Sequence, residues 1–546
     1  MRVTAEGRWA FASRDVFKAN SCEHCLRLAM AVKAGVPSVV ARVAPYIEDL
    51  GTKLPIIQGN EREAQVFEQL RQSLPEGQFL ELSGANPTDS VAAMSAGVPV
   101  IAQAYFKTLI GGYEWSGFAD LLVLDGYEIQ VDGEGLVSAQ KSADGPAGTK
   151  YQAWDVKNSS QGDPKYPLQL AAYQVALAQL GFASDADLGI ILGFRRGLVR
   201  YPVSEALSSF QSALERLTGV LALVTPETID ESFVRDWACA KKSMCVAVYC
   251  DYPELCAAEF KARDVLELLP RLNPAHGKRL RESGYQTVGQ LAAQGQPPVV
   301  TGVDQRHIDR YWNAARLMLL ERGGVRAYQS LLAGKAAVPG PNQQDIYFDV
   351  EWFNLVDEGA ELVFMFGAVD SAEDFTVFTA DDRAAELQAF DNFLDYAMAK
   401  LLVSEDMHIY HYHDPEPQKL RGLAARFAGH RQSDVEALCA RMVDLKKVVE
   451  KTLLPGSASY SIKKLEKYYD ADAKLNRNEL VAGGADAMYQ FHLYLQALQA
   501  GSTDEAATIM DEISAYNKDD CLSTKLLADW LRSLDFAAEG QVVTLG

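Results

Sequence analysis

Two carboxylates and a lysine stand at spacings that suit metal-assisted hydrolysis. Asp155-Val-Lys157 belongs to Tyr-Gln-Ala-Trp-Asp-Val-Lys, a run rich in aromatic and β-branched residues that predicts a strand. The two-residue period of a strand puts Asp155 and Lys157 on one face. With Asp120 from an upstream Gly-Phe-Ala-Asp, Asp155 could hold Mg²⁺ or Mn²⁺, while Lys157 orients or activates an attacking water. For the tripeptide alone, an exposed strand tip is the competing interpretation.

A helix is expected to follow this strand. Gln169 and Tyr173 lie four apart in Tyr-Pro-Leu-Gln-Leu-Ala-Ala-Tyr-Gln-Val-Ala-Leu-Ala, and the helical period therefore projects both from one face. Beside the metal-binding strand, they could steer a phosphate. The competing interpretation of Tyr173 is a half-buried core tyrosine.

In this order, the motifs resemble the RecB-like branch of the PD-(D/E)xK nucleases, whose pattern runs Gly-x-x-Asp, Asp-x-Lys, Gln-x-x-x-Tyr. The resemblance covers roughly residues 12–258 and implies a restriction-endonuclease-like core that cleaves phosphodiesters. The family also places a His or Glu on its first helix. Here Gly59-Asn-Glu-Arg-Glu63 is expected to open a helix with Ala64, Phe67 and Leu70 facing inward. Glu63 is then a candidate metal or water ligand, or a solvated carboxylate.

Most of the eight cysteines fall into two clusters, Cys22 with Cys25 and the group Cys239, Cys245, Cys250 and Cys256. In one subgroup of RecB-like nucleases, one N-terminal and three C-terminal cysteines bind a [4Fe–4S] cluster that joins the ends of the domain. The resemblance implies Cys22, Cys245, Cys250 and Cys256 as ligands, with a structural role. Cys239 is a rival for Cys245, Cys25 or His24 is a rival for Cys22, and zinc is the alternative metal.

The segment 259–332 reads as helix, glycine turn, helix, with Gly284 at the cap and Thr287 starting the second helix. It resembles a helix-hairpin-helix module. Such modules hold a nucleic-acid backbone through main-chain amides, and Lys278, Arg279 and Arg281 would supply positive charge. A helical spacer is the competing interpretation. Gly- and Pro-rich residues 333–342 are predicted to form a linker.

A second set of carboxylates follows the linker. Asp345-Ile-Tyr-Phe-Asp349-Val-Glu351 predicts a buried strand with Asp349 and Glu351 on one face. Far downstream, Tyr516 and Asp520 lie four apart on a predicted helix. These two motifs resemble the first and last motifs of the ribonuclease H-like DEDD exonucleases of the tyrosine subtype. The resemblance spans about residues 343–535, and Tyr460-Ser-Ile-Lys-Lys-Leu matches the YprB-like subgroup.

That resemblance implies trimming of 3′ ends with two metals held by four carboxylates, and with the tyrosine positioning the water. The remaining carboxylate is expected in the stretch His408-Ile-Tyr-His-Tyr-His-Asp-Pro-Glu416, where we assign Glu416. Asp414 is the nearest rival and Asp444 a weaker one. The alternating His408, His411 and His413 are interpreted as scaffold rather than as a zinc site.

The predicted fold class is an α/β multidomain protein. Residues 1–258 are expected to form the PD-(D/E)xK domain, 259–332 the helical module, 333–342 the linker, and 343–546 the ribonuclease H-like mixed-sheet domain. No apolar run is long enough to span a bilayer, and the N-terminus lacks the charged and then apolar segments of a secretory signal peptide. A cytoplasmic location without membrane contact is therefore expected.

The net charge of −21 argues against sequence-independent coating of duplex DNA, so nucleic acid would be held in local basic channels. The predicted function is a metal-dependent nuclease, most simply an exonuclease, on single-stranded DNA or DNA with free ends, with RNA also open. A nucleic-acid-binding scaffold with decayed sites and a nucleotide phosphodiesterase are the alternatives.

The order of the domains, with a nuclease-like domain on each side of a helix-hairpin-helix, resembles that of bacterial RecB-like nucleases. Those proteins are sometimes continued by a superfamily 1 helicase. This sequence has no Gly-x-x-x-x-Gly-Lys-Ser/Thr phosphate loop, so a helicase is expected only as a partner. Both a complete short form and a fragment ending at Gly546 fit this pattern.

Overall fold

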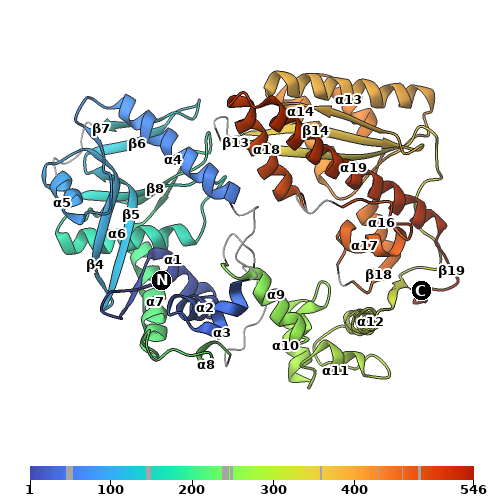
Figure 1. Cartoon of the computed structure of the whole chain (residues 1–546), viewed down its shortest axis with the longest axis horizontal. Coiled ribbons are helices and arrows are strands. Elements are labelled where there is room, and N and C mark those ends of the chain that lie inside the picture. Colours follow the sequence, from blue (N-terminus) through green and yellow to red (C-terminus); the bar gives the residue numbers. More distant parts are fainter. Residues whose placement is uncertain are drawn as a thin grey trace. The chain divides into compact units, whose positions relative to one another are not determined.

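The computed structural model describes residues 1–44, 53–142, 149–235, 245, 250–356, 360–427, 429–457, 459–477, 481 and 483–545. The described chain divides into two compact units, Met1–Cys256 with Leu355–Ala360, and Ala257–Asn354 with Glu361–Gly546. Both are mixtures of helices and sheets (Figure 1). In the described residues no helix combines the length and apolar character needed to cross a membrane.

Among the described residues, an eight-stranded mixed sheet forms the base of the first unit. Its main path is β1–β2–β5–β8–β9–β10, while β4 also pairs with β5 and β3 with β4. The strands are β1 (Arg2–Val3), β2 (Trp9–Phe11), β3 (Phe79–Glu81), β4 (Val100–Ile110), β5 (Tyr113–Leu124), β8 (Tyr151–Val156), β9 (Leu188–Ile191) and β10 (Leu198–Tyr201). A separate hairpin consists of β6 (Tyr127–Val131) and β7 (Val137–Lys141). Central β8 is antiparallel to β5 and parallel to β9.

Two helices pack on β8 and can therefore present side chains to its end, α4 (Lys53–Ser73) and α6 (Lys165–Leu180). The other helices of this unit are α1 (Ser13–Ser21), α2 (Glu23–Lys33), α3 (Pro37–Val43), α5 (Pro87–Ser95), α7 (Val203–Leu221) and α8 (Ser232–Arg235), while α9 (Pro253–Ala262) runs into the second unit.

The sequence prediction for α4 was partly wrong. The helix begins before Gly59, and Ala64 is exposed although Phe67 and Leu70 are buried as expected. Arg62 is buried in a position that the apolar pattern could not reveal, and its guanidinium donates to the Leu192 carbonyl at 3.2 and 3.3 Å. Burial lowers the pKa of Arg62 to about 10.

The second unit opens with a helical segment that has its own core. It contains the short 3₁₀ helix η3 (Leu266–Leu268), α10 (Pro274–Glu282), α11 (Val288–Ala292) and α12 (Gln305–Arg322). Gly284 has φ 95° after α10, and the Thr287 side chain caps α11, as the sequence predicted. In the segment predicted as a linker, β12 (Gly334–Lys335) pairs with β19 (Asp535–Phe536).

Within the part of the chain that the structure describes, the second unit has a five-stranded sheet in the order β15–β14–β13–β16–β17. Its strands are β13 (Ile346–Leu355), β14 (Ala360–Asp370), β15 (Phe375–Thr379), β16 (Ile409–His411) and β17 (Met442–Asp444). Strands β13, β16 and β17 are parallel, and β14 is antiparallel to β15. A smaller sheet joins β11 (Arg326–Ser330) to β18 (Leu453–Pro455) and β20 (Val542–Leu545).

Helices cover the five-stranded sheet, and the two-residue period of β13 decides which residues face which helices. Ile346, Phe348 and Val350 pack in a core with α13 (Arg383–Val403), α14 (Pro415–Arg426) and α15 (Gln432–Cys439). Tyr347 packs in the other core, with α16 (Leu445–Thr452), α17 (Ile462–Tyr469) and α19 (Thr503–Ser533), while α18 (Gly484–Gln499) packs on α19. The same alternation sends Asp349 toward the α19 side.

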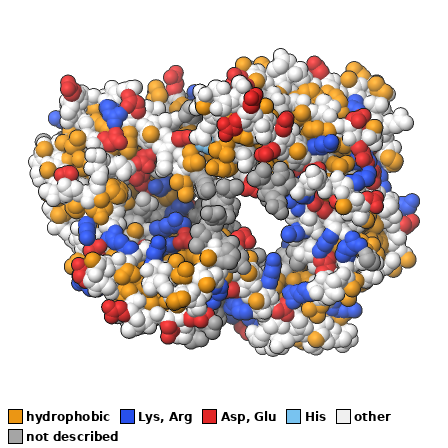
Figure 2. Space-filling model, in the orientation of Figure 1, with side chains coloured by type: hydrophobic (Ala, Val, Ile, Leu, Met, Phe, Trp, Pro, Cys, Tyr) orange, Lys and Arg blue, Asp and Glu red, His pale blue; other side chains and the backbone are white. Residues whose placement is uncertain are grey.

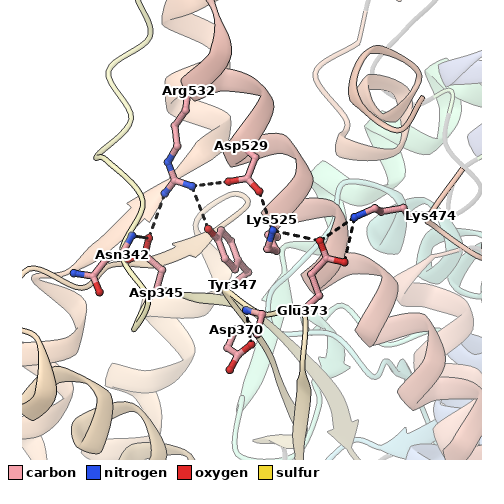
Figure 3. Close-up of polar contacts among 10 residues, drawn as sticks. Asn342, Asp345, Tyr347, Asp370, Glu373, Lys474, Lys525, Asp529 and Arg532 are labelled. Carbon is pink, nitrogen blue, oxygen red and sulfur yellow. Dashed lines mark hydrogen bonds and ion pairs between the residues drawn. The ribbon is translucent and has the colours of Figure 1, made fainter. Parts of the chain in front are cut away.

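A polar network fixes the end of α19 to the start of β13 (Figure 3). Arg532 donates to the buried Asp345 carboxylate at 3.3 Å, to the Tyr347 hydroxyl at 3.2 Å and to Asp529 at 2.8 Å. Lys525 continues the network from Asp529 to Glu373. These contacts hold the long helix in register with the strand that carries the acidic pair.

Candidate metal-binding sites

The antiparallel ladder of β5 and β8 brings the first acidic pair together. Its register places Asp120 across from Asp155, and the two side chains are hydrogen bonded. Asp120 also accepts a hydrogen bond from the Val156 backbone at 2.9 Å. Lys157 forms an ion pair with Asp155, and its Nζ lies 3.9 Å from Asp120 Oδ2. The three residues expected to act together are therefore in mutual contact.

Helix α6 adds one residue to this group and supports it with another. Gln169 Nε2 donates to Asp155 Oδ1 at 3.3 Å. Tyr173 is buried, and its hydroxyl donates to the Phe118 carbonyl of β5. A Cβ at Gly117 would lie only 3.1 Å from the Tyr173 ring, which explains the glycine of the Gly-Phe-Ala-Asp motif. Tyr173 contacts the strand that carries Asp120 rather than the carboxylates themselves.

Glu63 of α4 extends the acidic group. Burial and then the charge of Asp155 raise its pKa, and Gln103 of β4 donates a hydrogen bond to its carboxylate. Gln103 lies between Ala102 and Ala104, which pair with Leu121 and Ala119 on either side of Asp120, and it has φ 55°, which is uncommon for a residue with a side chain. The sequence analysis missed Gln103, because a glutamine within a strand pattern carries no signal of this kind.

The pKa values of Asp120 and Lys157 indicate different roles for the two side chains. Burial, and after it the charge of Asp155, raise the pKa of Asp120 well above the ordinary value. Burial lowers the pKa of Lys157, but attraction by Asp155 and Asp120 outweighs burial and the net change is upward. Lys157 therefore remains protonated at neutral pH, which suits it to orient an oxygen rather than to remove a proton.

In the second unit, β13 and α19 bring together Asp349, Glu351 and Asp520. One carboxylate oxygen from each lies within 4.8 Å of the others, so the three residues could hold a metal ion. Burial and the neighbouring charges of Glu351 and Asp520 raise the pKa of Asp349. Burial and Asp520 raise the pKa of Glu351 to about 8. A divalent cation would relieve this mutual repulsion.

Asn517 holds the first of these carboxylates, and it was not among the predicted residues. Its Nδ2 donates to Asp349 Oδ2 at 2.8 Å, and the side chain is fully buried. A Cβ at Gly367 would approach Asn517 Oδ1 to 1.6 Å, so Gly367 leaves the space that Asn517 occupies. Helical spacing could have found Asn517, three residues before Asp520, but nothing in the sequence pairs it with Gly367.

Tyr516 lies beside the acidic group with a cation above it. Its hydroxyl is hydrogen bonded to Asp520 and accepts a hydrogen bond from Lys463 Nζ at 3.3 Å. The same ammonium lies 4.5 Å from the centre of the Tyr516 ring. Burial, followed by the charges of Asp520 and Glu351, raises the pKa of Tyr516, so the hydroxyl keeps its proton. Lys463 belongs to the Tyr-Ser-Ile-Lys-Lys-Leu motif, but no role had been assigned to it.

A second cation balances the other side of the group. Arg477 forms ion pairs with Asp520 and with Glu466, and Ser523 donates to Glu466 at 3.0 Å. Burial lowers the pKa of Arg477, but these two carboxylates outweigh it and the net change is upward. Asp520 is therefore shared between the acidic group and a fixed guanidinium.

The assigned middle carboxylate lies near enough to act on the other acids. Glu416 is buried, it is hydrogen bonded to His411 Nδ1 at 3.1 Å, and its charge raises the pKa values of Asp349 and Glu351. Its rival Asp414 instead pairs with Lys447. The other rival, Asp444, caps α16 by accepting from the Lys446 and Lys447 backbones. Both rivals thus contact residues of α16.

Within the two cysteine clusters of the first unit, Cys22, Cys25, Cys250 and Cys256 are buried. The Cys25 thiol is hydrogen bonded to Cys250, which is also hydrogen bonded to Cys256. The contact with Cys250 and then burial raise the pKa of Cys25. The expected ligand Cys245 is half-buried, and the rival Cys239 lies outside the described residues.

The basic residues of the helical segment are already paired. Lys278 and Arg279 form ion pairs with Glu282, and Arg281 pairs with Glu267. These pairs are exposed or partly exposed, so each contributes little to stability and can exchange for a phosphate.

Comparison with known proteins bears on the second unit. A family model described as the RNase H superfamily matches residues 346–532, which run from the start of β13 into the end of α19. The second unit thus carries an RNase H-like domain, which confirms this part of the sequence prediction, and the match contains the residues Asp349, Glu351, Glu416, Tyr516 and Asp520. No curated protein and no solved structure matches the chain.

Proposed function

We propose that this chain is a metal-dependent nuclease with two hydrolytic sites, of which the second trims 3′ ends of DNA or RNA. The RNase H superfamily domain indicates a nuclease-type hydrolase that acts on nucleic acid. The observation that supports end trimming is the placement of the Tyr516 hydroxyl against the carboxylate group of Asp349, Glu351 and Asp520. Hydrolysis at such a site needs an aligned water, and a fixed phenol can align it.

Asp349, Glu351 and Asp520 would hold Mg²⁺ or Mn²⁺, which supplies polarisation of the phosphate and of the attacking water. Asn517 fixes the orientation of Asp349. Tyr516 orients the water through its protonated hydroxyl, and Lys463 fixes that hydroxyl and adds positive charge where negative charge develops on the phosphoryl oxygens.

The first unit would be a RecB-like PD-(D/E)xK nuclease. Asp120 and Asp155 would hold the divalent cation, with Glu63 close enough to contribute, and Lys157 would orient the attacking water as a cation. Gln169 fixes Asp155. The contacts of Asp120, Asp155 and Lys157 within one group support this assignment.

The same unit would hold a [4Fe–4S] cluster, with zinc as the alternative metal. The hydrogen-bonded thiols of Cys25, Cys250 and Cys256 fit a thiolate ligand set, with Cys22 or Cys245 as the fourth member. This arrangement makes Cys25 a stronger ligand candidate than the sequence spacing did. The cluster would join the two ends of the unit.

The test is a nuclease assay on end-labelled single-stranded, duplex and flapped DNA and RNA with Mg²⁺ or Mn²⁺. Asp349→Ala with Glu351→Ala should remove stepwise shortening from 3′ ends, while Asp120→Ala with Asp155→Ala should remove a different cleavage pattern. Loss of both patterns in either double variant would contradict two separate sites. Binding without any cleavage by the wild type would favour the alternative function, a nucleic-acid-binding scaffold that serves a helicase. In that case the ion pair with Arg477 would keep Asp520 from binding a metal ion.

A further inference from the structure

An open groove lined by charged and aromatic residues lies in the second unit beside the RNase H-like site. It has a volume of about 470 Å³ and is lined by Arg271, Tyr412, His413, Lys446, Glu450 and Tyr460. The helical segment supplies the arginine, the residues after β16 supply one wall, and α16 and the approach to α17 supply the rest. The groove therefore joins the helical segment to the RNase H-like domain.

Both walls of the groove continue into the candidate site. On one wall, Glu416 follows His413 by three residues and acts electrostatically on Asp349. On the other wall, Ile462 lines the groove and the next residue, Lys463, contacts Tyr516. Both walls of the groove therefore lead along the chain toward the acidic group, one through Glu416 and the other through Lys463.

The lining chemistry suits a nucleic-acid strand. The Arg271 guanidinium lies 5.3 Å from the centre of the Tyr460 ring and is paired with Glu450. In the described chain, the Lys446 side chain makes no hydrogen bond or ion pair. Lysine and arginine bind phosphates, and aromatic rings stack on bases without sequence preference. Figure 2 shows Lys and Arg side chains gathered over α17, β18 and α12 of this unit.

The backbone of the groove is strained at one lining residue. His413 has φ 90°, which a residue with a Cβ rarely adopts, and its backbone donates to Asp444 at 3.1 Å. The imidazole is exposed in the groove. Strained non-glycine residues are concentrated at ligand-binding sites, where the surroundings hold them in place. A glycine would adopt this conformation freely, whereas the sequence has a histidine with an exposed imidazole here.

We infer that this groove binds the single-stranded stretch immediately upstream of the 3′ end that enters the RNase H-like site. Lys446 and Arg271 contact its phosphates, and the tyrosine rings and His413 contact its bases. The inference rests on the proposed trimming activity for the direction of the strand. It predicts that affinity grows with strand length until the groove is filled, while the chemistry at the terminal nucleotide does not depend on the groove.

Trimming kinetics and binding would be measured for Lys446→Glu and Arg271→Ala, with Lys464→Glu as the control on an exposed lysine that does not line the groove. On a long single strand, each groove variant should raise KM with kcat unchanged, whereas on a dinucleotide neither constant should change. Binding by the Asp349→Ala protein should lose about one unit of the salt-dependence slope when Lys446→Glu is added, as expected for a lost phosphate contact.

An unchanged salt slope and KM on the long strand, or equal losses on the long strand and the dinucleotide, would overturn the inference. Absence of cleavage by the wild type would count against the proposed function alone, because the binding measurement still tests the groove. His413→Gly adds a separate check. It should weaken strand binding without lowering Tm, since glycine relieves the strained backbone while the imidazole is lost.

Discussion

At the residue scale, the carboxylates in both candidate sites repel one another unless a cation lies close to them. Asp120 and Asp349 are both half-buried, and their partial burial together with an acidic neighbour raises the pKa of each. In the first site a lysine lies between the acids, whereas in the second the cations lie outside the group, at Tyr516 and Asp520. The second site therefore has the larger electrostatic need for a bound cation.

This difference predicts how pH changes the stability of the second unit. Glu351 holds its proton up to a pKa of about 8 in the folded state, against an ordinary value of 4.5 in the unfolded chain. Between these values the folded state binds more protons, so the free energy of unfolding should fall as pH rises from 5 to 8 in chelator. Added Mg²⁺ should raise Tm more at pH 8 than at pH 5, because the ligands must be deprotonated. Thermal melts with and without Mg²⁺ would measure this, and equal shifts at both pH values would contradict it.

Lys463 and Tyr516 should act as one unit. Tyr516→Phe removes the hydroxyl that aligns the water and should slow trimming by roughly 10²-fold. Lys463→Met should slow trimming by about tenfold, but should have little further effect in Tyr516→Phe, since residues that act through each other are not additive. Single-turnover rates of the four proteins would test this, with Lys464→Met as the control. Independent, multiplying effects would mean that Lys463 acts on the substrate alone.

At the scale of elements, the second site depends on how α19 lies across β13. Asp345 and Tyr347 at the start of the strand are tied to Arg532 near the end of the helix, while Asp349 and Asp520 meet further along the same pair of elements. Substitutions that remove the contacts of Arg532 should therefore alter both the stability of the second unit and the geometry of the acidic group.

Arg532→Met should destabilise the second unit by about 3 kcal/mol, because it leaves the fully buried Asp345 carboxylate without its guanidinium. Adding Asp345→Asn should restore part of this loss. Urea denaturation would measure both variants, and Arg306→Met, at an arginine with 91 % side-chain exposure, should leave the midpoint unchanged. An unchanged midpoint in Arg532→Met would show that the pair contributes no net stability.

Sequence periodicity predicted the strand and helix faces of both sites, because Asp349 with Glu351 and Tyr516 with Asp520 follow local repeats. It also located the turn between α10 and α11 through Gly284 and Thr287. Contacts across long chain separations could not be predicted this way, which is why Lys463 and Gln103 were missed and why nothing paired Asn517 with Asp349. On α4, the pattern assigned Ala64 to the core, but Ala64 is exposed and the charged Arg62 is buried.

At the scale of the whole molecule, a metal cluster bound by the cysteines should stabilise the first unit only. Anaerobically purified protein should be brown with iron near four per chain, the stoichiometry of one cubane cluster. Cys25→Ser should lower the iron content, and Cys256→Ala should lower the Tm of the first unit without shifting that of the second. Cys439→Ala, at a half-buried thiol of the second unit, is the matched control. Colourless protein with stoichiometric zinc would exclude the cluster.

Asn517 and Asp349 meet across 168 positions of the chain, and that separation sets an order of events during synthesis. A ribosome that adds about 5–20 residues each second needs roughly 8–34 s to travel from the strand to the helix. During that interval β13 and its neighbouring strands already exist without Tyr516, Asn517 or Asp520. The RNase H-like site therefore cannot assemble on a nascent chain until the last helix has left the ribosome, and the strand β20, which closes against β11, emerges later still.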